Sequence, residues 1–184
     1  MDEQQAIRQL KSGDIGGLEF LVQRHQVKAT RTAYLITRDL GLAEDVVQES
    51  FIQVYRSIRS FDAARPFEPW FLRSVVNASV KMMQKSGKQV EVRTDADGDE
   101  WMDWFSEADS VETRIESAEF QRQVWDAMQK LSPRQRAVIV QRYYLEMSEK
   151  EMATASGVAR GTVKWLLNAA RERLRALLAE RSEK

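Results

Sequence analysis

The sequence of 184 residues contains no cysteine and few residues that break helices. Without cysteine, the chain forms no disulfide bond and no cysteine-ligated zinc site, which suits a cytoplasmic protein. Only three prolines and eight glycines are present, and apolar residues recur at spacings near one helical turn. Together these features predict an all-α fold.

Further absences narrow the function. No run of about 18 apolar residues occurs, so no membrane insertion is expected, and the polar start of the chain shows no secretory signal. The chain has a single histidine, His25, and neither a glycine-rich phosphate loop nor a convincing pair of nucleophile and base. We therefore expect no enzyme and no bound metal or cofactor, and we interpret His25 as a partly exposed helix residue.

A net charge of zero hides a division of charge along the chain. Residues 1–86 carry 12 basic and 10 acidic side chains, a net charge of +2. Residues 87–119 carry 3 and 11, a net charge of −8, and residues 120–184 carry 13 and 7, a net charge of +6. The basic C-terminal part is compatible with a nucleic-acid partner.

The C-terminal part contains two predicted helix starts and a tight turn. Ser132 is a predicted N-cap, and Gln135 is spaced to reach back to it. Ser148 and Glu151 repeat this capping box, and Gly157 suits the left-handed residue that ends the short helix after them. A second helix is expected to begin two residues later. Short helix, turn and second helix predict a helix-turn-helix, whose second helix enters the DNA major groove; a helical hairpin that only packs is the alternative.

The N-terminal part predicts several helices with short breaks. Apolar residues at helical spacing place them at residues 2–10, 14–35, 42–58 and 67–85. Residues 87–109 lose this periodicity and are acidic, which marks a linker. The predicted architecture is therefore two small helical domains, residues 1–86 and 110–184, joined by an acidic linker at 87–109, with the helix-turn-helix in the second domain.

Two segments together resemble a known family. The segment AEDVVQESFIQVYRSIRSFD (residues 43–62), continued by RPFEPWFLRSVVN (residues 65–77), resembles region two of bacterial sigma-70-class factors of the extracytoplasmic-function group. The segment from Leu131 to Arg175 resembles region four of the same group. The resemblance implies a factor that binds core RNA polymerase and directs promoter-specific initiation, and many family members are held inactive by an anti-sigma factor.

The resemblance also implies site residues. Asp45, Gln48 and Glu49 match the family's D-x-x-Q-E-x-F pattern, which implies contact with polymerase, whereas Phe51 of the same pattern is expected in the core. The positions that correspond to recognition of the promoter −10 element are Phe61, Arg65, Arg73, Asn77 and Lys81. Trp70 and Phe71 are spaced as core residues, although stacking on bases is the alternative.

The helix after the turn is expected to read the −35 element of promoter DNA. Its candidate contacts are Arg160, Thr162, Lys164, Trp165, Asn168 and Arg171. The family commonly has K-S-R-L-x-R-A-R here, but this chain reads KWLLNAAR, with Leu166 and Ala169 in place of two arginines. Fewer phosphate contacts imply weaker or unusually specific upstream binding.

Two other functions fit parts of the sequence. A helix-turn-helix regulator that never joins polymerase explains the C-terminal half but leaves the Asp45–Glu49 pattern unexplained. A protein-interaction module, whose divergent helix uses Trp165 and Leu166 to contact a regulator, reads little DNA. Binding to core polymerase would separate a sigma factor from the first alternative. Salt-dependent binding to upstream promoter DNA would separate a sigma factor from the second.

Overall fold

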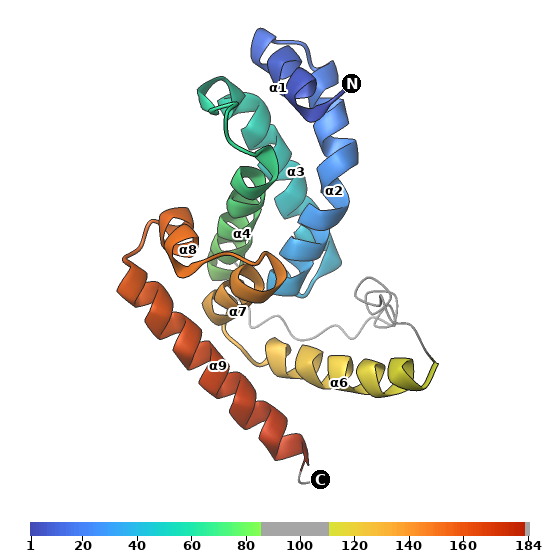
Figure 1. Cartoon of the computed structure of the whole chain (residues 1–184), viewed down its shortest axis with the longest axis vertical. Helices are drawn as coiled ribbons and strands as arrows, with labels where there is room; N and C mark the ends of the chain where they lie inside the picture. The colour runs from blue at the N-terminus through green and yellow to red at the C-terminus, as the bar shows by residue number, and fades with distance from the viewer. Residues whose placement is uncertain (86–110, 183–184) are drawn as a thin grey trace.

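The structure is a computed structural model that describes residues 1–85 and 111–182 of the chain (Figure 1). Within these residues every regular element is helical, which confirms the predicted all-α fold. The predicted acidic linker at 87–109 lies outside the described residues. No helix among those described is both long and apolar enough to cross a membrane. The elements are α1 (Glu3–Ser12), α2 (Gly16–Thr37), α3 (Leu40–Ser57), η1 (Ile58–Ser60), α4 (Phe67–Lys85), α6 (Val111–Gln129), α7 (Pro133–Ile139), η3 (Val140–Tyr144), α8 (Glu149–Ser156) and α9 (Arg160–Ser182).

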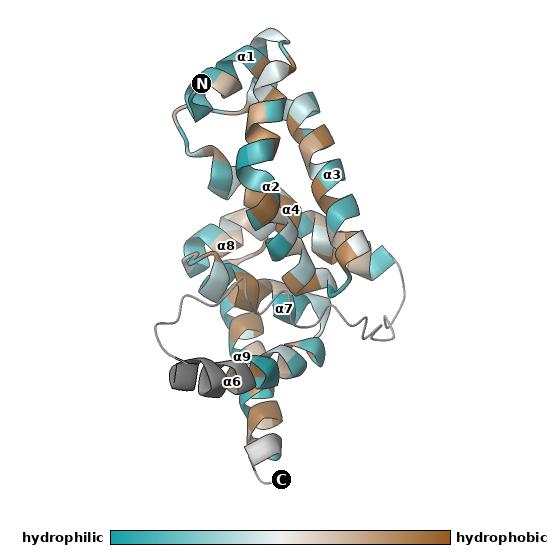
Figure 2. Ribbon diagram, turned by 90° about the vertical axis from the view of Figure 1, so that its right-hand side faces the viewer, coloured by the Kyte–Doolittle hydropathy of each residue, from teal (hydrophilic) through white to brown (hydrophobic). Residues whose placement is uncertain are grey.

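The N-terminal domain, α1–α4, packs around a core of aromatic rings. Phe71 on α4 is fully buried, with its ring 4.4 Å from Phe51 on α3 and 5.6 Å from Phe67. Burying each such ring contributes about 1.5–3 kcal/mol. This confirms Phe51 as core and shows that Phe71 belongs to the core as well. Figure 2 shows hydrophobic and hydrophilic residues interleaved along α2, α3 and α4, as the one-sided burial of these helices requires.

His25 is a core residue that connects three helices. Its side chain is 3% exposed, and its Nε2 lies 2.8 Å from the Glu3 carboxylate of α1. Its Nδ1 lies 3.5 Å from the Glu68 carboxylate of α4, and its ring packs 5.2 Å from Phe67. The expected partial exposure is therefore wrong, because sequence spacing on α2 does not reveal that α1 and α4 cover this position.

The C-terminal domain, α6–α9, confirms the predicted helix-turn-helix signals. Both capping boxes form: Ser132 accepts from the Gln135 backbone N–H, and Ser148 accepts from that of Glu151. Gly157 adopts a left-handed conformation with φ of 68°, and its N–H donates to Ala153 O at the end of α8. These local signals specify the turn between α8 and α9 without any distant contact.

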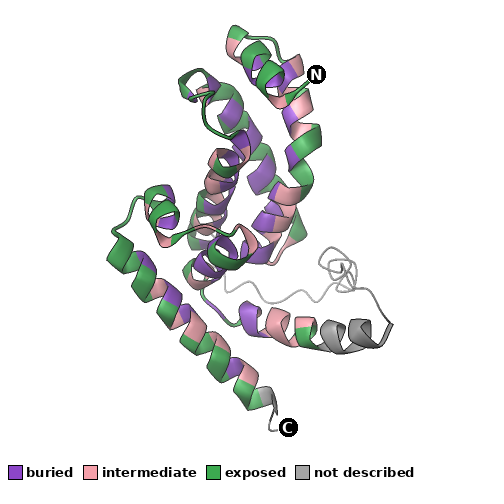
Figure 3. Ribbon diagram, in the orientation of Figure 1, coloured by how far each residue is buried: buried purple, intermediate pink, exposed green. Residues whose placement is uncertain are grey.

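The two domains pack against each other. A hydrophobic cluster joins Leu35 and Ile36 of α2 and Val76 of α4 to Val138 and Ile139 of α7. The ring of Tyr34 on α2 also stacks on Trp125 of α6, with centroids 5.4 Å apart. Figure 3 shows buried residues on the parts of α2, α4 and α7 that meet. The apolar contact between the two domains is therefore continuous, and it adds to the separate core of each domain.

Candidate nucleic-acid interface

The predicted polymerase patch lies on the outer face of α3. Asp45, Gln48 and Glu49 are all exposed, whereas Val46 and Val47 between them point into the core. Asp45 lies three positions before Gln48 and four before Glu49, so the three side chains form one polar surface about one helical turn long. A carboxylate pair on an exposed helix face can bind a basic partner.

The predicted −10 residues on α4 form a stripe with one side chain per turn. Arg73, Asn77 and Lys81 follow each other at intervals of four residues. Arg73 Nε and Asn77 Nδ2 both donate to the carbonyl oxygen of Ala155 on α8, at 2.9 Å and 3.0 Å. Lys81 is exposed. The structure thus brings these residues together but engages two of them with the other domain.

The remaining predicted −10 residues lie around the loop before α4. Arg65 is exposed and lies 3.5 Å from the Asp62 carboxylate. Phe61 is only 4% exposed, and its ring packs against Trp70 at 4.7 Å and Phe67 at 5.9 Å. Because the ring is enclosed, Phe61 cannot stack on a DNA base in this structure, and its predicted DNA contact is corrected to a core role. Trp70 is half-buried and belongs to the same aromatic cluster.

The predicted −35 surface lies on the first turns of α9. Thr162, Lys164, Trp165 and Asn168 are exposed, and Trp165 is 67% exposed although it is a large apolar residue. The opposite face of α9 carries Val163, Leu167 and Ala170 into the core. This division gives a recognition helix with one face held by the scaffold and one face open to a partner.

Two of the predicted −35 arginines have partners within the domain. Arg160 Nε lies 3.4 Å from the Glu149 carboxylate at the start of α8. Arg171 Nε donates to the Tyr143 hydroxyl at 2.8 Å, and its guanidinium lies 5.7 Å from the ring centroid of Tyr143. Both arginines are therefore oriented by the fold before any DNA binds.

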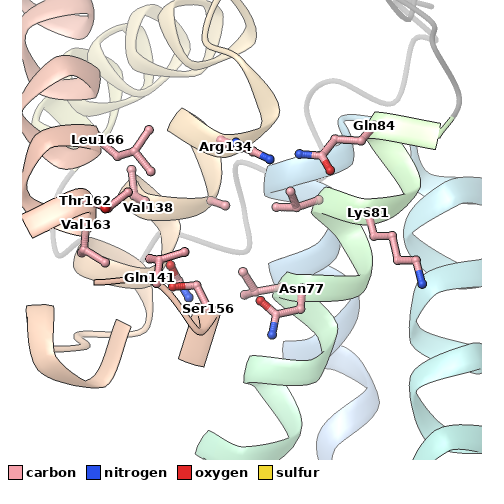
Figure 4. A pocket seen from close by; sticks show the side chains of 14 residues that line it. Asn77, Lys81, Gln84, Arg134, Val138, Gln141, Ser156, Thr162, Val163 and Leu166 are labelled. Carbon is pink, nitrogen blue, oxygen red and sulfur yellow. The ribbon is translucent and has the colours of Figure 1, made fainter. Parts of the chain in front are cut away.

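A cavity of 270 Å³ lies between α4 and the C-terminal domain (Figure 4). Asn77 and Lys81 border it from α4, and Thr162 borders it from α9. With its amide oxygen turned toward α7, Gln84 accepts a hydrogen bond from Arg134 Nε at 2.8 Å across the rim. The cavity therefore separates predicted −10 residues from the start of the predicted −35 helix.

Sequence reasoning missed two arginines that join the domains. Arg136 is 2% exposed, and its Nε and Nη1 donate to Ile36 O and Leu131 O, each at 2.7 Å. Arg38 Nη1 donates to Gln129 O at 2.5 Å. Burial, followed by the charge of Arg38, lowers the pKa of Arg136 to about 10, so it stays cationic at neutral pH. The burial of Arg136 was indicated by its spacing in the sequence, because it shares a helix face with the buried Ile139 and Val140.

Two known protein families match the two domains. Sigma-70 region 2 matches residues 21–89, which include the exposed α3 patch and the α4 stripe. Sigma-70 region 4 matches residues 121–174, which include the capped helices and the open face of α9.

Individual relatives match along nearly the whole chain. The ECF RNA polymerase sigma factor SigW of Bacillus subtilis is 30% identical over 178 residues, which cover 95% of each chain. The ECF RNA polymerase sigma-E factor of Haemophilus influenzae is 29% identical over 178 residues, covering 94% of this chain and 93% of the relative.

Solved structures agree with the sequence matches. CnrH, in its complex with the cytosolic domain of CnrY, is similar with a TM-score of 0.62 and 25% identity, over 97% of this chain and 99% of that chain. The sigma factor RpoE of Bartonella quintana, in complex with the anti-sigma factor NepR, has the same fold with a TM-score of 0.60 and 23% identity. That similarity covers 88% of this chain and 98% of that one.

Proposed function

The chain belongs to the extracytoplasmic-function RNA polymerase sigma factors, and we propose that it uses the α3 patch to bind core polymerase and α4 and α9 to read promoter DNA. One observation carries this assignment of surfaces. The same chain presents an exposed acidic patch of Asp45, Gln48 and Glu49 and, in its other domain, a helix-turn-helix whose open face carries Lys164 and Asn168. A polymerase contact and a DNA contact are both needed for promoter-directed initiation.

The roles of the individual promoter contacts follow from their positions. Arg65, Arg73, Asn77 and Lys81 are proposed for the −10 element, where holding a base out of the stack costs a few kcal/mol and requires compensating contacts. Arg160, Thr162, Lys164, Trp165, Asn168 and Arg171 are proposed for the −35 element. There, phosphate contacts position the helix and Trp165 is placed to touch a thymine methyl group.

A sigma factor supplies binding surfaces and no bond-making chemistry, and we propose no catalytic residue for this chain. Its place of action is that of RNA polymerase, the bacterial cytoplasm. An anti-sigma factor is a further proposed partner, since the similar sigma factor RpoE is bound to the anti-sigma factor NepR and the similar CnrH is bound to the cytosolic domain of CnrY.

Reconstituted transcription tests the proposed function. Purified protein is added to core polymerase and to a promoter fragment selected from a random DNA pool with the same holoenzyme. Specific transcripts are expected from the wild-type chain and from Asp45→Glu, which keeps the carboxylate, but not from Asp45→Arg. Circular dichroism checks that both variants remain folded.

Two outcomes would favour other functions. DNA binding that neither needs polymerase nor changes with Asp45→Arg would favour the helix-turn-helix regulator. Absence of salt-dependent binding to the upstream half of the promoter would favour the protein-interaction module.

A further inference from the structure

The loop before α4 is an exposed segment between two buried anchors. Residues 62–66 are all exposed, whereas Phe61 and Phe67 on either side of them are 4% and 0% exposed. The ring centroids of these two phenylalanines lie 5.9 Å apart, so the ends of the loop are held close together. Arg65, one of the proposed −10 contacts, belongs to this exposed segment. The position of the loop therefore depends on what holds its two ends.

The first end of the loop is fastened by a cation from α1. Lys11, in the last turn of α1, donates from Nζ to the carbonyl oxygen of Phe61 at 2.5 Å. A hydrogen bond from an ammonium group is charge-assisted and stronger than one between neutral groups. The bond joins residues 50 positions apart and holds the main chain at the residue where the exposed loop begins.

The second end of the loop is connected to the same helix. The carboxylate of Glu68, in the first turn of α4, lies 3.5 Å from His25 Nδ1 and makes an ion pair with Lys28 of α2. The other ring nitrogen of His25 lies 2.8 Å from the Glu3 carboxylate of α1. α1 therefore supports both ends of the loop, directly through Lys11 and by way of His25 at the start of α4.

α1 is itself held closely against α2. Its Ile7 and Leu10 side chains are buried in the core of the N-terminal domain. The two helix backbones approach each other at Gly17, where an added Cβ would lie 2.2 Å from Ala6 O. Packing this close leaves α1 little room to shift. Since sigma-70 region 2 matches residues 21–89, the support that α1 gives to the loop comes from outside the matched segment.

We propose that Lys11 is a positioning residue for recognition of the −10 element. It fixes the loop before DNA binds, so that Arg65 and the backbone of residues 62–66 are already in place to hold a base that has left the stack. The inference rests on the proposed function, which assigns this loop to −10 DNA. A loop that is ordered in advance loses less conformational entropy on binding, and its affinity for the captured base is correspondingly higher.

The absence of native cysteine allows the loop to be followed directly. Ala64→Cys places one nitroxide label at an exposed loop residue outside the proposed polymerase and DNA contacts. Adding Lys11→Met, which removes the ammonium but keeps an unbranched side chain, should narrow the electron paramagnetic resonance lines of this label. Lys11→Arg keeps a cationic donor and should leave the lines broad. Arg8→Met, which removes a charge from an exposed position of α1, should do the same. Equally broad lines for Lys11→Met overturn the inference.

Binding of −10 DNA tests the effect on recognition. The unlabelled full chain is combined with core polymerase and with single strands that carry the −10 element of the selected promoter, in which an abasic site replaces each base in turn. The replacement that weakens wild-type binding most identifies the captured base. Lys11→Met should reduce the preference for that base by about tenfold, whereas Lys11→Arg and Arg8→Met should retain it. Circular dichroism checks that each variant is folded.

The outcomes separate the two proposals. If no abasic site weakens binding by the wild-type holoenzyme, the proposed reading of −10 DNA fails, and the role of Lys11 in it fails as well. If one base matters but Lys11→Met keeps the full preference for it, or weakens binding of every strand equally, positioning by Lys11 is overturned while the proposed function stands.

Discussion

Arg136 Nε donates a 2.7 Å hydrogen bond to the carbonyl oxygen of Ile36, a residue 100 positions earlier in the chain. The arginine is 2% exposed, and its Nη1 donates to a second backbone carbonyl, that of Leu131. A buried cation held by two backbone carbonyl oxygens, one in the last turn of α2 and one in the loop between α6 and α7, joins the two domains. These two hydrogen bonds from Arg136 explain why the contact between the domains has a defined geometry.

Replacing Arg136 with methionine is expected to destabilise the chain. The variant leaves the buried carbonyl oxygens of Ile36 and Leu131 without this donor, and an unsatisfied buried acceptor costs about 1–3 kcal/mol. Urea unfolding at neutral pH measures the change in free energy. Arg175→Met removes the same charge from an exposed position of α9 and should change stability by less than about 0.5 kcal/mol. Equal midpoints for the two variants would contradict a structural role for Arg136.

Replacing Gly17 with alanine is expected to disrupt the contact between α1 and α2. A Cβ at this position would lie 2.2 Å from Ala6 O and 2.9 Å from Leu10 N. Because both neighbours are backbone atoms, α1 must move, and overpacking of this kind costs about 1–3 kcal/mol or more. Thermal unfolding measures the loss. Gly161→Ala is the control: its Cβ meets nothing within 4 Å, and alanine should stabilise α9 by about 0.5–1 kcal/mol.

The α8 capping box predicts a pH dependence. Hydrogen bonds from the Ser148 hydroxyl at 2.6 Å and backbone N–H at 2.8 Å lower the pKa of Glu151 below its ordinary value of 4.5. The folded chain therefore holds this proton less tightly than the unfolded chain. The resulting stabilisation is fully present above pH 4.5 and is lost as the pH falls through the lower, folded-state pKa.

Ser148→Ala tests this box. At pH 7 the loss of the N-cap hydroxyl should cost about 1 kcal/mol in urea unfolding. The difference from wild type should shrink as the medium is acidified, because protonated Glu151 gains less from the hydroxyl donor. Thr154→Ala removes an exposed hydroxyl that bonds only within α8, to Lys150 O, and should show no such pH dependence. A gap that widens in acid would rule out the carboxylate's part in the box.

Two neighbouring substitutions on α9 should affect DNA binding differently. Lys164→Ala removes a charge placed to reach a phosphate, so it should weaken binding to all duplexes and reduce the slope of log affinity against log salt by about one. Trp165→Ala should leave that slope unchanged and reduce discrimination between the selected promoter and mutated upstream sequences. Fluorescence anisotropy over a series of salt concentrations measures both. Identical behaviour of the two variants would argue against the proposed −35 surface.

Local features of the fold were predictable from the sequence, whereas long-range contacts were not. Ser132, Ser148 and Gly157 act on residues three or four positions away, so spacing alone predicts their caps and the turn. Helical periodicity indicates that a face is buried but not what covers it. The burial of His25 by α1 and α4 depends on packing between segments distant in sequence, and that of Phe61 depends on how the loop before α4 places its ring against Trp70.

In the candidate site, too, local features were predictable from the sequence and long-range contacts were not. The α3 pattern predicted one exposed surface for Asp45, Gln48 and Glu49, and their exposure agrees. Their contact with polymerase stays a prediction. The bonds of Arg73 and Asn77 to Ala155 O had no signal in the sequence, because alanine has no polar side chain and the acceptor belongs to the backbone.

The carbonyl acceptors at the domain interface have a genetic consequence. Arg38, Arg73, Asn77 and Arg136 contribute side chains to these bonds, while their partners contribute only main chain. Every residue type has a carbonyl, so substitutions at Gln129 or Ala155 leave the acceptor in place. Exchanging the charges of two side chains cannot restore a lost donor, because the acceptor is a main-chain carbonyl. Suppressor mutations should therefore arise among the donor residues or in the apolar cluster between the domains. Sequence variation among relatives should accordingly show little pairwise covariation across these contacts.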